Sequence, residues 1–168
     1  MTYFSKTMPS PLGTLLLVAT EKGLAAVLWE GEDGSRVRLG PTVADPRHAI
    51  LVETERQLNL YFDGQLRQFS VPLDFQGTEF QKSVWAALLT IPWGETRSYG
   101  EIARQIGRPT AARAVGAANG RNPISIIAPC HRVVGSTGKL IGFAGGLAAK
   151  EYLLGIEAGK TANATHRE

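Results

Sequence analysis

Residues 122–134 read NPISIIAPCHRVV, an apolar, strand-like run that ends at Pro129 and is followed directly by Cys130. His131 and Arg132 come next, and cationic neighbours favour the thiolate, which is the nucleophilic form of cysteine. Neighbouring side chains of an extended strand point to opposite faces, so Cys130 and His131 would not touch there. Either the backbone turns at this point, helped by Pro129, or a water molecule carries the proton between the two side chains.

Cys130 is the only cysteine of the chain, which excludes an internal disulfide and a zinc site built from several cysteines. The three histidines, His48, His131 and His166, are too scattered to suggest a metal cluster, so we expect no metal. A lone cysteine is then either an inert buried residue, which is common for free cysteine, or a reactive thiol. A neighbouring cysteine and histidine occur together too often by chance to decide between the two.

The whole chain of 168 residues can form one compact domain or two small ones packed together. A hydrophobic content of 43% and a charged content of 20% are typical of a soluble globular protein. No apolar run approaches the length of a membrane span, and the first residues, MTYFSKTMPSPLG, lack the apolar stretch of a secretory signal. We therefore expect a cytoplasmic protein that does not enter a membrane.

Charge is distributed unevenly along the chain. Residues 1–76 hold seven Lys and Arg against nine Asp and Glu, whereas residues 77–168 hold eleven against six. The first part is therefore net −2 and the second net +5, in agreement with the total of +3. The basic part is the one that carries the cysteine, which suggests a polyanionic partner, although a few surplus charges also occur on ordinary solvated surfaces.

The first 76 residues predict a small sheet and a helix, with tight turns at Gly and Pro. Apolar residues recur at helical spacing from His48 to Phe62, and Gly64 follows as a stop signal. A domain boundary is expected near Gly77. The remaining predicted elements are strands at 15–20, 24–30 and 69–75 and a polar loop over 31–47.

The second part predicts short helices with clear start signals. Thr78 and Gln81 form a capping-box pattern for a helix that should run to about Thr90, and Ser98 and Glu101 repeat it. The helix that begins at Ser98 should end near Gly107. Thr110 is expected to cap a third helix over 111–120, and the two short helices with the GRP turn between them resemble a helix-turn-helix.

The third of these helices, AARAVGAANG, has Arg113 as its only long side chain. Small residues allow a buried helix to pack closely, which is the commoner explanation for such a composition. The same small residues would also allow the helix to approach a nucleic-acid groove, with Arg113 reaching inward. These residues by themselves favour the buried helix.

Four motifs then follow one another in the second part of the chain: RAVGAANGRNPI at 113–124, PCHRVV at 129–134, GFAGG at 142–146 and KEYLL at 150–154. Their order and spacing resemble the methylated-DNA–protein-cysteine methyltransferases, also called O6-alkylguanine-DNA alkyltransferases. The resemblance covers residues 78–157 strongly and residues 1–76 more loosely. It implies an α/β (α+β) fold with two domains. Residues 1–76 would form a small N-terminal domain with an antiparallel sheet and a helix, and residues 77–168 a mainly helical domain with a helix-turn-helix and the active-site cysteine.

The resemblance also implies the catalytic roles. Cys130 is similar to the family's alkyl acceptor, and His131 to the histidine that takes up the proton through a water. Glu157 matches the carboxylate that orients this histidine, and Asn122 matches an asparagine that braces the turn carrying the cysteine. Tyr99 matches the tyrosine that donates to the base and helps to turn its phosphate outward.

For DNA, the resemblance implies that Arg113 enters the duplex where the base has left. The other expected DNA-binding residues, besides Tyr99, are Ala114, Gly116, Ala117 and Asn119. The expected base pocket is formed by Pro129, Val133, Phe143, Ala144 and Gly145. In it, the carbonyls of Cys130 and Val133 would accept from the guanine amino group, and the amide of Ala144 would face the alkylated oxygen.

The implied activity is direct-reversal DNA repair, in which the alkyl group of O6-alkylguanine, and of O4-alkylthymine, moves irreversibly to Cys130. The base must first leave the duplex, and one protein molecule is consumed per lesion, without a cofactor. The implied partner is double-stranded DNA with alkylated bases, bound by a monomer without an obligate protein partner. Cooperative binding along DNA stays open. The expected location becomes the nucleoid in the cytoplasm, or the nucleus of a eukaryote.

One departure concerns Phe143, where many relatives have tyrosine. A phenyl ring keeps the apolar wall but loses a hydrogen bond that contributes about 0.5–1.5 kcal/mol, so we expect slower or differently selective transfer.

The alternatives to this function are a non-catalytic module that binds alkylated DNA, a Cys-His hydrolase, and a helix-turn-helix regulator with Cys130 as sensor. Taken alone, Tyr99 and Trp85 could be core residues and Glu157 a solvated charge. The N-terminal domain is expected to support the C-terminal one without touching DNA, because it is net negative.

Overall fold

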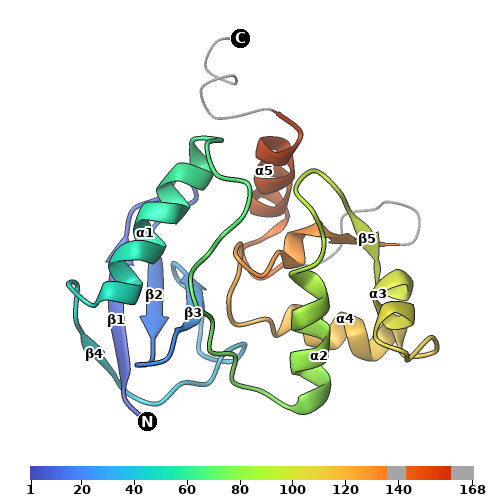
Figure 1. Ribbon diagram of the computed structural model, residues 1–168, viewed down its shortest axis with the longest axis horizontal. Helices are drawn as coiled ribbons and strands as arrows, with labels where there is room; N and C mark the ends of the chain where they lie inside the picture. The colour runs from blue at the N-terminus through green and yellow to red at the C-terminus, as the bar shows by residue number, and fades with distance from the viewer. Residues whose placement is uncertain (136–142, 160–168) are drawn as a thin grey trace.

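The computed structural model describes residues 1–135 and 143–159. A sheet with one helix lies on one side of the molecule and a group of short helices on the other (Figure 1). The C-terminal helix α5, Leu147–Glu157, stands between these two parts. This architecture is the expected mixed α/β fold. No helix in the described part of the chain is long and apolar enough to cross a membrane.

The N-terminal sheet has the strand order β3-β2-β1-β4. Strands β1 (Tyr3–Met8), β2 (Leu15–Ala19) and β3 (Leu24–Trp29) pair antiparallel, as expected for short strands joined by tight turns. The prediction of a continuous loop over 31–47 is wrong, because β4 (Thr42–Ala44) pairs parallel with β1. All three residues of β4 are exposed, so this edge strand has no buried apolar pattern that a sequence could reveal.

Helix α1, Ala49–Phe62, confirms the helical spacing found in the sequence. The side chain of His48 caps its start by accepting from the amide of Ile50, so this histidine has a structural role at the half-buried helix end. The chain leaves the helix through Gly64, whose φ of 75° favours glycine. Helix α1 packs on strands β1, β2 and β3, and its last turn places Tyr61 and Phe62 in the core.

The strand predicted over 69–75 is not present. Only Leu73 forms an isolated bridge, with Leu24 of β3. The backbone still joins the edge of the sheet, because the amide of Leu24 donates to Pro72 and the amide of Asp74 donates to Leu24. Pro72 has no amide hydrogen to donate, so regular strand pairing cannot extend along this segment.

The two capping boxes are confirmed. Thr78 and Gln81 cap α2 (Glu79–Leu88), and Ser98 and Glu101 cap α3 (Tyr99–Gln105). The expected cap of the next helix is wrong: α4 (Ala112–Gly120) begins after Ala111, and no side chain caps it. Helices α3 and α4 pack on each other and on α2. A small parallel pair of strands, β5 (Arg97–Ser98) and β6 (Val133–Val134), was not predicted.

The apolar run before Cys130 turns instead of forming a strand. Ile126 has a φ of 74°, a left-handed conformation that is rare for a β-branched residue. Cys130 then begins a single 3₁₀ turn, η1 (Cys130–Arg132). We expected either a backbone turn at Cys130 and His131 or a water that carries the proton between them. The structure has the backbone turn.

This turning segment also connects the two parts of the molecule. Its apolar side chains, among them Ile124 and Ile126, are buried in the same hydrophobic cluster as the sheet, α1 and α5. Cys130 and Val133 belong to a second cluster, formed with α2, α3 and α4. The cysteine thus sits at the end of a segment that is anchored in both cores.

Candidate active site

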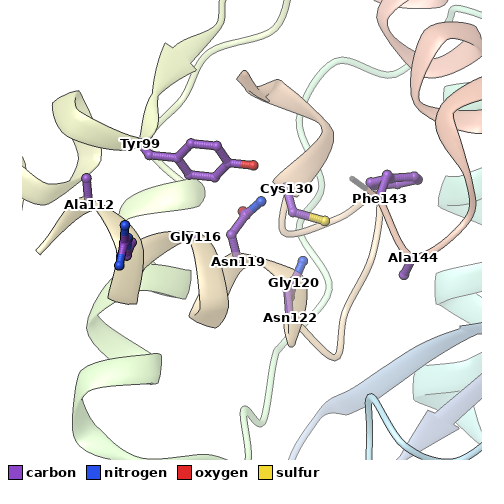
Figure 2. Close-up of a pocket in the computed structure, with 10 residues that line it drawn as sticks. Tyr99, Ala112, Gly116, Asn119, Gly120, Asn122, Cys130, Phe143 and Ala144 are labelled. Atoms are coloured by element: carbon purple, nitrogen blue, oxygen red, sulfur yellow. The ribbon is translucent and has the colours of Figure 1, made fainter. Parts of the chain in front are cut away.

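A cavity of about 630 Å³ opens beside Cys130. Figure 2 shows the sulfur of Cys130 lying between the rings of Tyr99 and Phe143, with Asn119 on the Tyr99 side and Asn122 below. The lining brings together most of the residues expected from the sequence, and consists of Tyr99, Ala112, Arg113, Gly116, Asn119, Gly120, Asn122, Cys130, Phe143 and Ala144. In the described part of the chain, no three His, Cys, Asp or Glu side chains are grouped so that they could hold a metal ion.

Other expected residues lie around the cavity but do not line it. Ala114 and Ala117 are exposed on the outer side of α4, next to Arg113. Pro129 and Val133 are buried behind the cysteine. Gly145 supports the wall, because a Cβ there would lie 2.8 Å from the indole ring of Trp29.

Asn122 holds the turn that carries Cys130. Its side-chain nitrogen donates to the carbonyl of Ala128 (2.8 Å), and its side-chain oxygen accepts from the amide of Ile124 (3.1 Å). The carbonyl of Ala128 also accepts from the amide of Cys130 (2.8 Å). The asparagine is therefore placed to brace this turn, which is the role that the resemblance implied for it.

The protonation state of Cys130 differs from the expectation. Burial raises the pKa of this thiol, and a hydrogen bond from Asn122 and the charges of Arg36 and Lys150 only partly oppose that effect. The cations that face the sulfur are thus remote in sequence, and Arg132 points elsewhere. Arg132, a neighbour expected to favour the thiolate, is bound to Glu157 instead, and the reaction requires a base to accept the proton of Cys130.

His131 is placed to be this base. It is fully buried, and its Nε2 lies 2.6 Å from Oε2 of Glu157. A carboxylate can only accept, so Nε2 carries the hydrogen and Nδ1 of the neutral ring is left with a free lone pair. Burial lowers the pKa of His131 although Glu157 opposes this, so the ring is neutral at neutral pH. Nδ1 has no hydrogen-bond partner among the described residues, so its lone pair is available to accept a proton.

Glu157 is a buried residue at the end of α5, so the alternative of a solvated surface charge is wrong. The guanidinium of Arg132 binds both carboxylate oxygens of Glu157, with Nε donating to Oε1 (2.8 Å) and Nη2 donating to Oε2 (3.0 Å). Burial raises the pKa of Glu157, but donors from His131, Arg132 and Tyr61 outweigh this and bring it to about 2. The carboxylate is therefore ionised and fixes the tautomer of His131.

Tyr99 and α4 form the opposite side of the cavity. Tyr99 stands in the first turn of α3, and its ring lies against Gly116, where a Cβ would be 3.8 Å away. The side-chain oxygen of Asn119 is buried and has no hydrogen-bond partner within the described residues, so it can accept from a ligand. Arg113 is exposed at the mouth of the cavity.

Several functional positions were not found from the sequence. Arg36 donates to the backbone carbonyl of Asn122 and is itself held by Glu32. Trp29 donates to Ser125 (3.1 Å) and meets Phe143 edge-on, with ring centroids 5.5 Å apart. These residues lie 86 to 114 positions from their partners, and no local pattern marks such distant contacts.

Lys150 is a further position of this kind, on the first turn of α5. It is completely buried, and its Nζ donates to the carbonyl of Val133 (2.7 Å). This is the carbonyl expected to accept from a guanine amino group. A carbonyl oxygen has two lone pairs, so it can accept a second hydrogen bond.

Comparisons with known proteins find matches for both parts of the chain. The family model for the 6-O-methylguanine DNA methyltransferase DNA-binding domain matches residues 79–159, and that for the family's ribonuclease-like domain matches residues 3–75. A methylated-DNA–protein-cysteine methyltransferase of Mycobacterium leprae is 51% identical over 90% of each chain. One from Methanosarcina acetivorans is 53% identical over 88% of this chain and 94% of its own.

Among solved structures, Mycobacterium tuberculosis OGT in complex with DNA is similar over the full length of both chains. The TM-score is 0.86 and the sequence identity is 48%. The likeness thus covers the sheet, the helices and the site together. The chain belongs to the 6-O-methylguanine DNA methyltransferase family.

Proposed function

We propose that this protein repairs DNA by moving an alkyl group from O6 of guanine to the sulfur of Cys130. The observation that carries the proposal is that the only cysteine of the chain faces a cavity of about 630 Å³ beside the helix pair α3–α4. This volume lies within the range of small-molecule sites, so it can take one base turned out of the duplex. O4-alkylthymine is proposed as a second substrate of the same site.

The proposed reaction begins with the proton of Cys130, which passes through a water to Nδ1 of His131. The hydrogen on Nε2 stays on the ring and remains hydrogen-bonded to Glu157, whose negative charge stabilises the imidazolium. The sulfur then attacks the alkyl carbon, the bond from this carbon to O6 breaks, and its electron pair stays on the guanine oxygen. The Tyr99 hydroxyl is proposed to donate to the base as this charge develops. The guanine anion then takes up a proton and the imidazolium of His131 gives one up, so that a thioether, a neutral guanine and a neutral His131 result and each molecule reacts once.

DNA binding is proposed to involve the exposed side of α4. Ala114 and Ala117 are small and exposed there, which allows close approach to the duplex, and Arg113 can fill the space left by the base. Contacts to phosphates would make the binding sensitive to salt and weakly dependent on sequence. Because the partner is chromosomal DNA, we propose action at the nucleoid in the cytoplasm, or in the nucleus of a eukaryote, by a monomer without an obligate protein partner.

Residues 1–76 are proposed to be a supporting domain for residues 77–168. Its core includes side chains of the segment before Cys130, and Arg36 and Trp29 bond to that segment directly. Deletion of residues 1–76 should therefore prevent folding or repair. Normal repair by the shortened chain would contradict the supporting role.

Intact-protein mass spectrometry after incubation with duplex DNA containing O6-methylguanine tests the proposed function. One added methyl group per molecule is expected, a peptide map should place it on Cys130, and the reaction should stop after one equivalent. The Cys130→Ala variant should bind the same DNA without gaining mass. Binding by the wild type without any gain in mass would indicate a non-catalytic module, and continued turnover would indicate a hydrolase.

A further inference from the structure

Glu157 receives a donor from the N-terminal part of the chain in addition to those from η1. The hydroxyl of Tyr61, in the last turn of α1, donates to Oε2 of Glu157 at 2.7 Å. The same oxygen accepts from His131 at 2.6 Å and from Arg132 at 3.0 Å. Tyr61 and Glu157 are 96 positions apart in the sequence, so this hydrogen bond joins the N-terminal part of the chain to α5.

The ring of Tyr61 is held rigidly. The residue has no exposed surface, and its ring meets Trp93 edge-on with centroids 5.6 Å apart and Phe69 at 5.4 Å. Helix α1 is in turn packed on the sheet. The hydroxyl therefore has a fixed direction, and it reaches Glu157 without rearrangement of the surrounding core.

We propose that Tyr61 is a positioning residue for alkyl transfer, whose hydroxyl shares Oε2 of Glu157 with His131 and so limits how strongly the carboxylate stabilises the protonated imidazole. The inference rests on the proposed role of His131 as the proton acceptor. When a carboxylate oxygen accepts from several donors, its hydrogen bond to each donor is weaker than it would be with that donor alone. The N-terminal part would then adjust the acid–base chemistry of the site as well as support it.

Tyr61 stays uncharged among the charged groups that surround Glu157. Arg132 and Lys150 are cations whose charges lower the pKa of His131, and Glu157 is the anion that raises it, while burial lowers it most. Burial and the charge of Glu157 raise the pKa of Tyr61 well above its usual value, so its hydroxyl stays protonated. The titratable and charged groups facing the network are Tyr61 of α1, Cys130, His131 and Arg132 of η1, and Lys150, Tyr152 and Glu157 of α5.

The Tyr61→Phe variant removes this one hydrogen bond and keeps the ring and the net charge. Its Glu157 should hold the imidazolium more strongly, so the pKa of His131 should rise. The rate of a single transfer to Cys130, measured against pH, should then show its acidic limb at higher pH than in the wild type. Above this limb the variant should transfer at least as fast, because a more basic His131 takes the proton at least as readily.

Tyr3→Phe is the control, because it removes the same hydroxyl from a half-buried tyrosine of strand β1, outside the groups that face Glu157. Its pH profile should coincide with that of the wild type. Replacement of Tyr61 by a fluorotyrosine, whose hydroxyl is a stronger donor, should move the limb the opposite way, toward lower pH.

The inference would be overturned if the acidic limb of the pH–rate profile stayed in place for both replacements of Tyr61. A rate reduced by one constant factor at every pH would overturn it as well, and Tyr61 would then be a packing residue. Thermal unfolding of the same variants shows whether such a constant factor reflects lost stability. A wild-type protein that gains no alkyl group on Cys130 would instead refute the proposed function, so the two failures are distinguishable.

Discussion

Replacement of Asn122 by alanine would test how the turn that carries Cys130 is held. Asn122 is buried, and the change removes its side-chain hydrogen bonds, among them those with Ala128 and Ile124. The amide of Ile124 would lose its acceptor in a fully buried position, at a cost of about 1–3 kcal/mol. The carbonyl of Ala128 still accepts from the amide of Cys130. The loss of its hydrogen bond from Asn122 should therefore cost nearer the ordinary net value of about 1 kcal/mol.

Together these losses predict a decrease of about 2–4 kcal/mol in the free energy of unfolding, a large part of the roughly 5–15 kcal/mol typical of native proteins. For a chain of this size the melting temperature should fall by about 4–16 °C. Denaturant titration and calorimetry measure both quantities. Transfer to Cys130, measured well below the melting temperature, should also be slower, because the sulfur is no longer held in one position.

The matched control is Asn59→Ala, an identical chemical change at an exposed position of α1. It should alter the free energy of unfolding by no more than about 0.5 kcal/mol. If Asn122→Ala proved as mild as this control and transferred at the wild-type rate, the bracing role of Asn122 would be refuted.

Three further predictions concern DNA, pH and the thiol. Arg113→Ala should slow repair of duplex DNA far more than reaction with the free base. Arg56→Ala, at an exposed position of α1, should change neither rate. Equal slowing of both substrates by Arg113→Ala would contradict a role of Arg113 in base flipping. Unfolded His131 takes up a proton near pH 6.5, but burial lowers its pKa in the folded protein, so the free energy of unfolding should fall as the pH drops below about 6.5. His131→Gln should lack this component in pH-dependent melting, and an unchanged dependence would argue against a buried neutral histidine. Because burial raises the pKa of Cys130, an aromatic disulfide reagent should label the native thiol slowly at neutral pH and the unfolded thiol quickly. Equal labelling rates would count against the buried thiol.

Local signals in the sequence predicted the features that depend on neighbouring residues. The capping boxes at Thr78 and Ser98 are correct because each satisfies backbone donors within three residues, whatever the rest of the chain does. Helix α1 is correct for a related reason, since its apolar spacing and Gly64 lie within one segment. Thr110 failed as a cap because α4 begins one residue later, after Ala111, whose side chain cannot accept from the free amides.

By itself, the sequence determined the family, the mixed architecture and the capped helices, because their signals lie in short runs of neighbouring residues, and it predicts Cys130 as the reactive residue. Only the tertiary structure decided the left-handed turn at Ile126, the raised pKa of Cys130 and the burial of Glu157. It also brought Arg36 and Tyr61 to the site from the N-terminal part. The physical reason is that burial and hydrogen bonding between distant segments depend on how two hydrophobic cores pack against one another, and no local pattern encodes that packing.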